Sequence, residues 1–305
     1  MVPPDFSAID QISMLDVRAL NRLYELAHTC DGGILELGPY VGGSTIAIAS
    51  GNAGRVPHSV IEVGGSYIDH PSIPSTDIIA DWHRNLERFG CAGAAELFQG
   101  ASYRREVRDA ALAHCGRIGL FFVDADGHVA PCIRAFSPWF TENCILAIDD
   151  YDSPGAPNKQ ALVKSWVDSQ LAQGHLVAEG LLGGTWFGRI NGPSGLAALR
   201  NVSPYIHDSG HAYMAHFGMV ELADYLDDGS RSRLRLFEDG RELGPAHCMH
   251  ADIRERGEGR FSHWRAAIDS TSCLYFSASD NSDPRSNGLH YEVDLGQGRV
   301  SLADM

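Results

Sequence analysis

The chain has 305 residues, of which 44% are hydrophobic and 21% charged, and its formal net charge is −15. This composition is ordinary for a folded globular protein, and the length is sufficient for two domains. Because an acidic chain repels phosphate backbones and anionic lipid surfaces, we expect neither a nucleic-acid partner nor a membrane partner.

The apolar runs and the cysteines indicate a cytoplasmic protein. No apolar run reaches the length of about 18 residues that a membrane-spanning helix needs, and the first residues lack the pattern of a signal peptide. The seven cysteines are scattered, without a CxxC pair. We therefore expect neither a zinc ribbon nor a disulfide framework.

Segments with helical spacing of apolar residues alternate with short apolar runs, which are typical of buried strands, up to residue 190. The first six expected elements are a helix at 12–29, a strand at 34–37, a helix at 44–50, a strand at 59–63, a helix at 76–90 and a strand at 95–100. The next six are a helix at 103–116, strands at 118–124 and 144–150, a helix at 158–174, and strands at 175–182 and 185–190.

This alternation predicts an α/β fold for residues 1–193. Apolar strands separated by helices form a parallel sheet with helices on both faces, which is a Rossmann-like, doubly wound arrangement. The last two strands are separated only by Gly183 and Gly184. They must therefore pair as an antiparallel hairpin at the end of the mostly parallel sheet.

Residues 194–305 predict a small β-rich domain, preceded by a linker at 191–195. A hairpin is expected around Asp239–Gly240, with further strands at 273–279 and 289–295. The polar loops suit carbohydrate hydroxyls, so we expect an acceptor-binding or glycan-binding role. The alternative is a structural β module whose segment 280–288 forms a turn-rich loop. His247 and His250 resemble a pair of metal ligands, but no third ligand follows.

The segment 32–45 (GGILELGPYVGGST) places a glycine-rich loop between a strand and a helix. Gly38, Gly42 and Gly43 allow a tight turn and a close approach of the backbone to a ligand. The pattern is neither the dinucleotide motif GxGxxG nor a phosphate-binding loop ending in GK[ST]. The alternative is that the glycines only form a tight turn.

The motif ExGxxxGGS resembles the first motif of class I S-adenosylmethionine (SAM)-dependent methyltransferases, whose sheet also ends in an antiparallel hairpin. This resemblance implies that SAM is the cofactor and that the loop binds its amino-acid end. Glu62, at the end of the next strand, would bind the ribose hydroxyls. Gln99 and Ser102 would contact the adenine. The loop residues implied in cofactor binding are Glu36, Gly38, Tyr40, Gly42 and Ser44.

Acidic residues follow two of the apolar strands. Asp124 comes directly after one strand, and Asp149 and Asp150 come after the next. Ligands of open parallel sheets bind beyond the carboxyl ends of the strands, so these carboxylates should converge there. Clustered carboxylates repel one another unless a cation joins them, and oxygen ligands suit Mg²⁺ or a similar divalent ion. The sequence therefore predicts a metal site formed by these three residues.

The acidic segments resemble metal-dependent O-methyltransferases of the catechol and antibiotic-sugar types, and FVDADGH resembles the FIDGDH of a broader methyltransferase family. The resemblance implies that Asp124 also lies beside SAM and that a base takes the proton of the acceptor. Candidates for the base are His128, Asp124 and Asp126. Such relatives often have a lysine where this chain has Gly127, so the identity of the base stays open.

The leading hypothesis is a metal-assisted, SAM-dependent O-methyltransferase acting on a hydroxyl of a small molecule or saccharide. The second is a metal-free methyltransferase that uses His128 as its base. The third is a glycan-binding protein whose Rossmann-like half is vestigial. The oligomeric state stays open, and a homodimer is one of the assemblies considered, since many enzymes of this kind are dimers.

Overall fold

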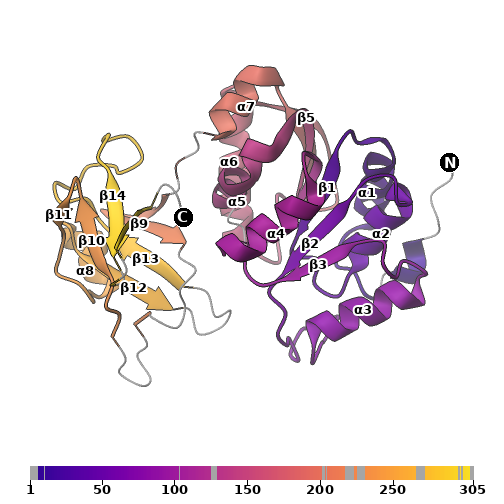
Figure 1. Ribbon diagram of the computed structural model, residues 1–305, viewed down its shortest axis with the longest axis horizontal. Helices are drawn as coiled ribbons and strands as arrows, with labels where there is room; N and C mark the ends of the chain where they lie inside the picture. The colour runs from indigo at the N-terminus through magenta and orange to yellow at the C-terminus, as the bar shows by residue number, and fades with distance from the viewer. Residues whose placement is uncertain are drawn as a thin grey trace. The chain divides into compact units, whose positions relative to one another are not determined.

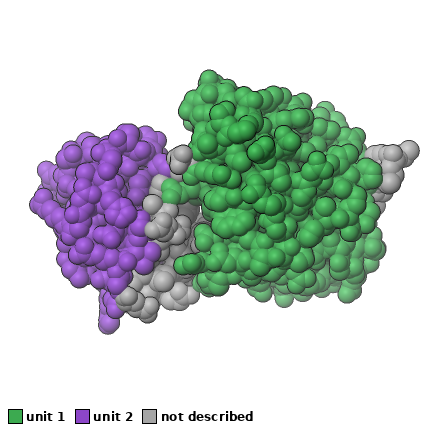
Figure 2. Space-filling model, turned by 45° about the horizontal axis from the view of Figure 1, so that its top comes forward, with its two compact units in different colours: residues 1–201 green, residues 202–305 purple. Residues whose placement is uncertain are grey.

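The chain folds into two compact units, residues Met1–Asn201 and Val202–Met305 (Figure 2). The structure, a computed structural model, describes residues 6–9, 11–102, 104–124, 129–200, 203, 205–216, 223–224, 231–265, 272–294, 296 and 298–302. No helix among these residues is long and apolar enough to cross a membrane.

The N-terminal unit is built on a seven-stranded sheet with the order β3-β2-β1-β4-β5-β7-β6 (Figure 1). Strand β7 is antiparallel to both of its neighbours, and the pairs from β3 to β5 are parallel. This confirms the predicted sheet and its terminal hairpin. The strands are β1 (Gly33–Leu37), β2 (His58–Glu62), β3 (Glu96–Gln99), β4 (Ile118–Val123), β5 (Phe140–Ile148), β6 (Leu176–Leu182) and β7 (Thr185–Ile190).

Helices cover both faces of this sheet. Successive residues of a strand point to opposite faces, and the strands β1, β2 and β4 are buried at every position, so both faces need to be covered. Ile34 and Phe122 pack with helices α1 and α2 on one face. On the other face Phe121 contacts Phe136 of α5, and Ser59 donates a hydrogen bond to Ala111 of α4. The helices are α1 (Val17–Thr29), α2 (Gly43–Asn52), α3 (Ile78–Arg88), α4 (Arg105–Cys115), α5 (Val129–Phe136), α6 (Pro157–Ala172) and α7 (Gly192–Arg200), with 3-10 turns η1 (Phe6–Ile9) and η2 (Ser137–Trp139).

The structure differs from the sequence prediction at the start of the first helix, at the end of the unit and in helix α5. The first helix begins at Val17, because the Asp16 side chain accepts a hydrogen bond from the Arg18 amide and caps the helix there. The expected linker at 191–195 instead enters α7, which packs against β5, so the unit extends to Asn201 rather than to residue 193. Helix α5 was not expected, because its eight residues are too few to show a clear period.

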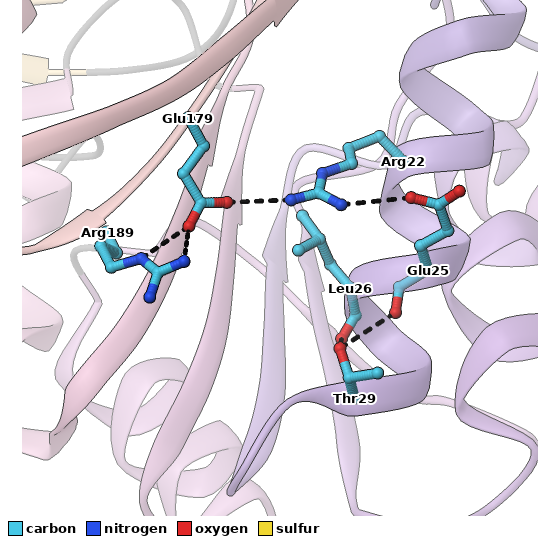
Figure 3. A network of polar contacts seen from close by, with 6 residues as sticks. All are labelled: Arg22, Glu25, Leu26, Thr29, Glu179 and Arg189. Atoms are coloured by element: carbon cyan, nitrogen blue, oxygen red, sulfur yellow. Dashed lines mark hydrogen bonds and ion pairs between the residues drawn. The ribbon is translucent and has the colours of Figure 1, made fainter.

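The terminal hairpin is fastened to the first helix by ion pairs (Figure 3). Glu179 of β6 accepts hydrogen bonds from Arg22 of α1 (2.9 Å) and from Arg189 Nε of β7 (2.6 Å). Beside them, a Cβ atom on Gly183 would lie 2.5 Å from the Cβ of Asp16, the cap residue of α1. The hairpin turn and the start of α1 are therefore in close contact.

The C-terminal unit contains two antiparallel four-stranded sheets, with orders β11-β10-β14-β15 and β12-β13-β9-β8. Apolar residues from both sheets, among them Leu236, Phe276 and Tyr291, share one core. The predicted hairpin around Asp239–Gly240 is present as β10 and β11. The elements are β8 (Ile206–Ser209), β9 (Ala212–His216), β10 (Arg235–Glu238), β11 (Arg241–Glu242), α8 (His250–Arg256), β12 (Phe261–Arg265), β13 (Ser272–Phe276), β14 (Tyr291–Asp294) and β15 (Arg299–Ser301).

Candidate functional site

The carboxyl ends of β2, β1, β4 and β5 meet along one edge of the sheet. The Gly38 amide donates a hydrogen bond to the carbonyl of Ile61 in β2 (3.0 Å), the Asp124 amide to Leu37 in β1 (3.0 Å), and the Asp149 amide to Val123 in β4 (2.9 Å). The glycine loop and the acidic residues therefore follow neighbouring strands. The chain winds in opposite directions on either side of β1 and β4, which is where ligands of such sheets bind.

The glycine loop turns sharply between β1 and α2. Gly38 and Gly42 have left-handed φ values of 76° and 99°. A Cβ on Gly42 would lie 3.0 Å from both Trp82 and Leu86 of α3, and one on Gly43 would lie 2.5 Å from the Cβ of Ser13. Both the backbone conformation and the packing therefore require glycine, and the amino end of α2 points into the edge described above.

Glu62 lies beside this loop. Its carboxylate is buried and accepts hydrogen bonds from the amides of Tyr40 (3.1 Å) and Gly64 (3.0 Å). Burial raises the pKa of Glu62, and the same amide hydrogen bonds oppose that rise. A carboxylate has about four acceptor positions, so about two remain for hydroxyl donors. This geometry fits a residue that holds a pair of ribose hydroxyls.

Tyr40 has a left-handed φ of 52° and reaches across to the segment after β2. Its hydroxyl donates to the Ile73 carbonyl, and its ring lies 5.6 Å from the ring of His70. The side chain therefore ties the glycine loop to the long connection between β2 and α3.

Glu36 and Ser44 lie beneath the loop. Glu36 has no exposed surface, and Ser44 is also buried. The Ser44 hydroxyl donates to Glu36 Oε1 (2.5 Å), which links α2 to β1. The cofactor role of both residues stays a prediction.

The two residues predicted to contact adenine lie at and just after the end of β3. Gln99 is exposed, and its side-chain nitrogen lies 3.0 Å from the Cβ position of Gly64, two residues after Glu62. The Gly100 amide donates to the carbonyl of Glu62 (2.8 Å). Ser102 is half-buried two residues further on. Gln99 thus lies next to the tip of β2, and the adenine role of both residues stays a prediction.

Asp124, Asp149 and Asp150 form a compact cluster. Each offers a carboxylate oxygen, and these oxygens all lie within 4.8 Å of one another. All three side chains are half-buried, so water and small ligands can reach them. The donor set fits a hard divalent cation, which prefers several carboxylate oxygens and keeps some of its water.

Thr185 holds one of these carboxylates and was missed by the sequence analysis. Its hydroxyl, at the start of β7, donates to Asp149 Oδ1 (2.5 Å). Burial raises the pKa of Asp149, whereas this hydrogen bond lowers it. A threonine after a glycine turn carries no signal in the sequence, because only the pairing of β5 with β7 brings it to Asp149.

A lysine that the sequence analysis did not select also reaches the cluster. Lys159 Nζ, from α6, lies 3.7 Å from Asp150 Oδ2. The chain's only other lysine, Lys164, donates to the Tyr151 hydroxyl (2.8 Å) and pairs with Asp168 (3.0 Å). Both lysines of the chain therefore lie on α6 and contact the segment that follows β5.

Two of the three candidate bases, His128 and Asp126, lie outside the described residues. Asp124, the third, is placed in the acidic cluster. The assignment of the base therefore stays a prediction.

The two candidate metal ligands of the C-terminal unit, His247 and His250, contact different residues. His247 Nδ1 lies 2.9 Å from Asp224 Oδ1, whereas the ring of His250 stacks on Tyr275 at 4.0 Å. The 280–288 segment is a loop held by short-range hydrogen bonds from the amides of Ser282 and Arg285 to the aspartates two residues earlier. These bonds agree with the expected turn-rich loop.

Comparison with known proteins finds similarity in structure only. No protein-family model and no curated protein matches the sequence. The O-methyltransferase TomG from Streptomyces achromogenes, in complex with SAM, is 15% identical over 61% of this chain and 89% of its own, with a TM-score of 0.48. An O-methyltransferase from Bacillus cereus in complex with SAH (S-adenosylhomocysteine) is 16% identical over 62% of this chain and 93% of its own, with a TM-score of 0.45. CalS11, a TDP-rhamnose 3'-O-methyltransferase of calicheamicin biosynthesis, is 18% identical over 57% of this chain and 78% of its own, with a TM-score of 0.43.

The fold of the N-terminal unit is established by its own strand arrangement. Five parallel strands with a reversal of winding at β1 and β4 are followed by an antiparallel β7 that lies between β5 and β6. Helices cover both faces, and the glycine loop follows β1. The N-terminal unit therefore has the Rossmann-like, doubly wound fold with a terminal antiparallel hairpin that the sequence predicts.

Proposed function

We propose that the N-terminal unit transfers a methyl group from SAM to a hydroxyl of a small molecule or saccharide, assisted by a divalent cation. One observation carries this proposal: the Asp124–Asp149–Asp150 cluster follows the strands directly beside the glycine loop. A cofactor-binding loop between β1 and α2 (the cofactor bed) and a cation site lie on the same edge of the sheet in this proposal. Together they can bring a methyl donor and an activated hydroxyl into contact.

The residues of the loop support SAM as the cofactor. SAM supplies an electrophilic methyl group on a positively charged sulfur. The amino end of α2 and the glycine loop can receive its carboxylate end, and Glu62 retains acceptor positions for two hydroxyls.

The acidic cluster supports cation assistance. A divalent ion bound there would lower the pKa of a hydroxyl that it contacts. Asp124, Asp149 and Asp150 would hold the ion, and Thr185 would keep the Asp149 carboxylate in place.

The proposed methyl transfer is a single nucleophilic substitution at the methyl carbon. The acceptor oxygen forms a bond to the methyl carbon while the bond from that carbon to sulfur breaks, and the electron pair stays on sulfur to give neutral SAH. The hydroxyl proton passes to a base, for which we propose His128 or Asp124. We propose a small molecule or a saccharide as the acceptor, and a homodimer as the assembly.

Metal-free transfer is the second candidate, and Lys159 favours it. Its ammonium group lies beside Asp150, so a cation of the protein itself already offsets part of the cluster's charge. In that case the acids would only hold the acceptor, and His128 would be the sole base.

Calorimetric titrations of the full chain with SAH and with Mn²⁺ test the proposal. We expect the wild type to bind both. Asp149→Ala should lose Mn²⁺ binding and keep SAH binding, because the carboxylate belongs to the cluster and not to the glycine loop. Asp152→Ala is the matched control, since this nearby acid is exposed and lies outside the cluster. Absence of SAH binding by the wild type would refute methyl transfer, and unchanged Mn²⁺ binding by Asp149→Ala would refute the metal role.

A further inference from the structure

We infer that His58 is a positioning residue for cofactor binding, acting through Glu36 on the glycine loop. The inference rests on the proposed binding of SAM. It assigns a role to a histidine at the opposite end of β2 from Glu62, where no contact with a cofactor is possible because the side chain is enclosed.

Glu36 forms a bridge between two side chains from different elements. Its Oε1 accepts from Ser44 in the first turn of α2 (2.5 Å), and its Oε2 lies 3.3 Å from His58 Nε2 in β2. The residues are on the same face of the sheet, because Ile34 of β1 pairs with His58 and Glu36 lies two residues further along. The bridge thus joins β2, β1 and α2.

Burial isolates the bridge from water. Glu36 is 0% exposed and His58 is 1% exposed. Within the part of the chain that the structure describes, Glu36 Oε2 and both ring nitrogens of His58 have no hydrogen-bond partner of good geometry. A buried carboxylate is costly unless it is paired, and the imidazole of His58 is the group that faces Oε2.

The position of the bridge connects it with the cofactor. Ser44 follows Gly42 and Gly43 directly, and these glycines fix the turn that forms the cofactor bed. If Glu36 loses its compensating partner, the carboxylate must find water or another donor, and Ser44 is released with it. The first turn of α2 and the loop before it then lose their fixed geometry.

The exposed His114 forms a second histidine contact, which provides a comparison on the same strand. Ser59, the next residue of β2, faces the other side of the sheet, where its hydroxyl lies 2.8 Å from His114 Nδ1 of α4. This pair also links β2 to a helix, but that helix does not adjoin the glycine loop. His114→Gln therefore disturbs a similar contact without touching the bridge.

The test measures the Kd of SAH by calorimetry for the full chain, in the wild type, His58→Gln, Glu36→Gln, the double variant and His114→Gln. We expect His58→Gln to raise the Kd by roughly 10-fold, within the range by which a mutation without ligand contact alters binding through a packed network. The double variant should bind no more weakly than the weaker single variant, and His114→Gln should bind as the wild type does.

Three outcomes would overturn the inference. A folded His58→Gln variant with a wild-type Kd would show that the histidine is only structural, and so would multiplicative effects in the double variant. If His58→Gln does not fold, Ser44→Ala cuts the other end of the bridge, and a wild-type Kd there rejects the inference. Absence of SAH binding by the wild type would instead refute the proposed function. Wild-type binding with an unchanged Kd in the variants refutes only the role of His58, so the two failures are distinguishable.

Discussion

Asp150 adopts a left-handed backbone conformation with a φ of 60°, which is unfavourable for a residue with a side chain. Its neighbour Asp149 is held by Thr185, and its own carboxylate lies beside Lys159. Residues in such conformations persist where the surrounding structure fixes them, and they are frequent at functional sites. Here the strained residue is the one that turns a second carboxylate toward Asp124.

Lys159 should compete with a divalent cation for the acidic cluster. We expect Lys159→Met to bind Mn²⁺ more tightly, by roughly 10-fold, because one neighbouring positive charge interacts with a cation by about 1 kcal/mol or more at a partly exposed site. Calorimetry in low-salt buffer measures the change. Lys164→Met is the control, since Lys164 contacts Tyr151 and Asp168 instead. Equal affinities in the wild type and Lys159→Met would contradict this competition.

His263 should make the C-terminal unit sensitive to acid. Burial lowers the pKa of His263 to about 4, against an ordinary 6.5, even though the Asp224 carboxylate raises it. The unfolded chain therefore binds a proton that the folded chain does not between these two values, so stability falls as the pH drops through this window. The expected contribution is about 2 kcal/mol between about pH 7 and about pH 5.

Urea unfolding of the wild type and His263→Gln at the two pH values measures this contribution. The variant should lose less free energy of unfolding on acidification than the wild type, because it has no imidazole to protonate. Ser232 lies 2.7 Å from His263 Nδ1 and can still donate to the glutamine oxygen. An identical acid response in both proteins would show that His263 does not titrate in this range.

At the scale of elements, the terminal hairpin depends on α1 for its place. The turn before Thr185 packs on Asp16, and Glu179 links Arg22 with Arg189 (Figure 3). The first helix of the chain thus supports the strand that carries the hydroxyl bound to Asp149. This connection between distant segments explains how an N-terminal helix can influence the acidic cluster.

Removing the charge of Glu179 should weaken that support moderately. Glu179→Gln is expected to lower the free energy of unfolding by about 1 kcal/mol, because exposed arginine–carboxylate pairs contribute little singly and somewhat more as a network. Thermal unfolding with SAH titration tests this. The Kd of SAH should not change, since the hairpin lies away from the glycine loop. A shift in that Kd would point to a wider coupling.

At the scale of the whole molecule, the two units have separate cores. Among the described residues, the apolar clusters of the C-terminal unit consist of residues after 202, and those of the N-terminal unit consist of residues before 201. Separate cores allow separate folding. The proposed acceptor-binding or glycan-binding role of residues 202–305 can therefore be tested on its own, with a glycan array.

A chain that ends after residue 201 should fold and bind SAH like the full chain. The reason is that every residue of the proposed cofactor bed and acidic cluster belongs to the N-terminal unit. Circular dichroism and calorimetry on the truncated chain check this. An unfolded product, or one that binds SAH at least tenfold more weakly, would show that the second unit completes the site.

The sequence by itself determined the alternation of strands and helices, the terminal hairpin and the edge on which the candidate functional residues lie. These follow from local patterns: apolar periodicity, glycine turns and acids placed directly after buried strands. For the same reason the positions of Gly38, Glu62 and Asp149 could be predicted without coordinates.

Only the tertiary structure decided which side chains are open and which partners they have. Glu36 carries the acidic position of the motif but is enclosed between Ser44 and His58, and Thr185 and Lys159 reach the cluster from β7 and α6. Such contacts join side chains from different strands, helices and loops. They depend on sheet order and helix packing, which no local pattern specifies.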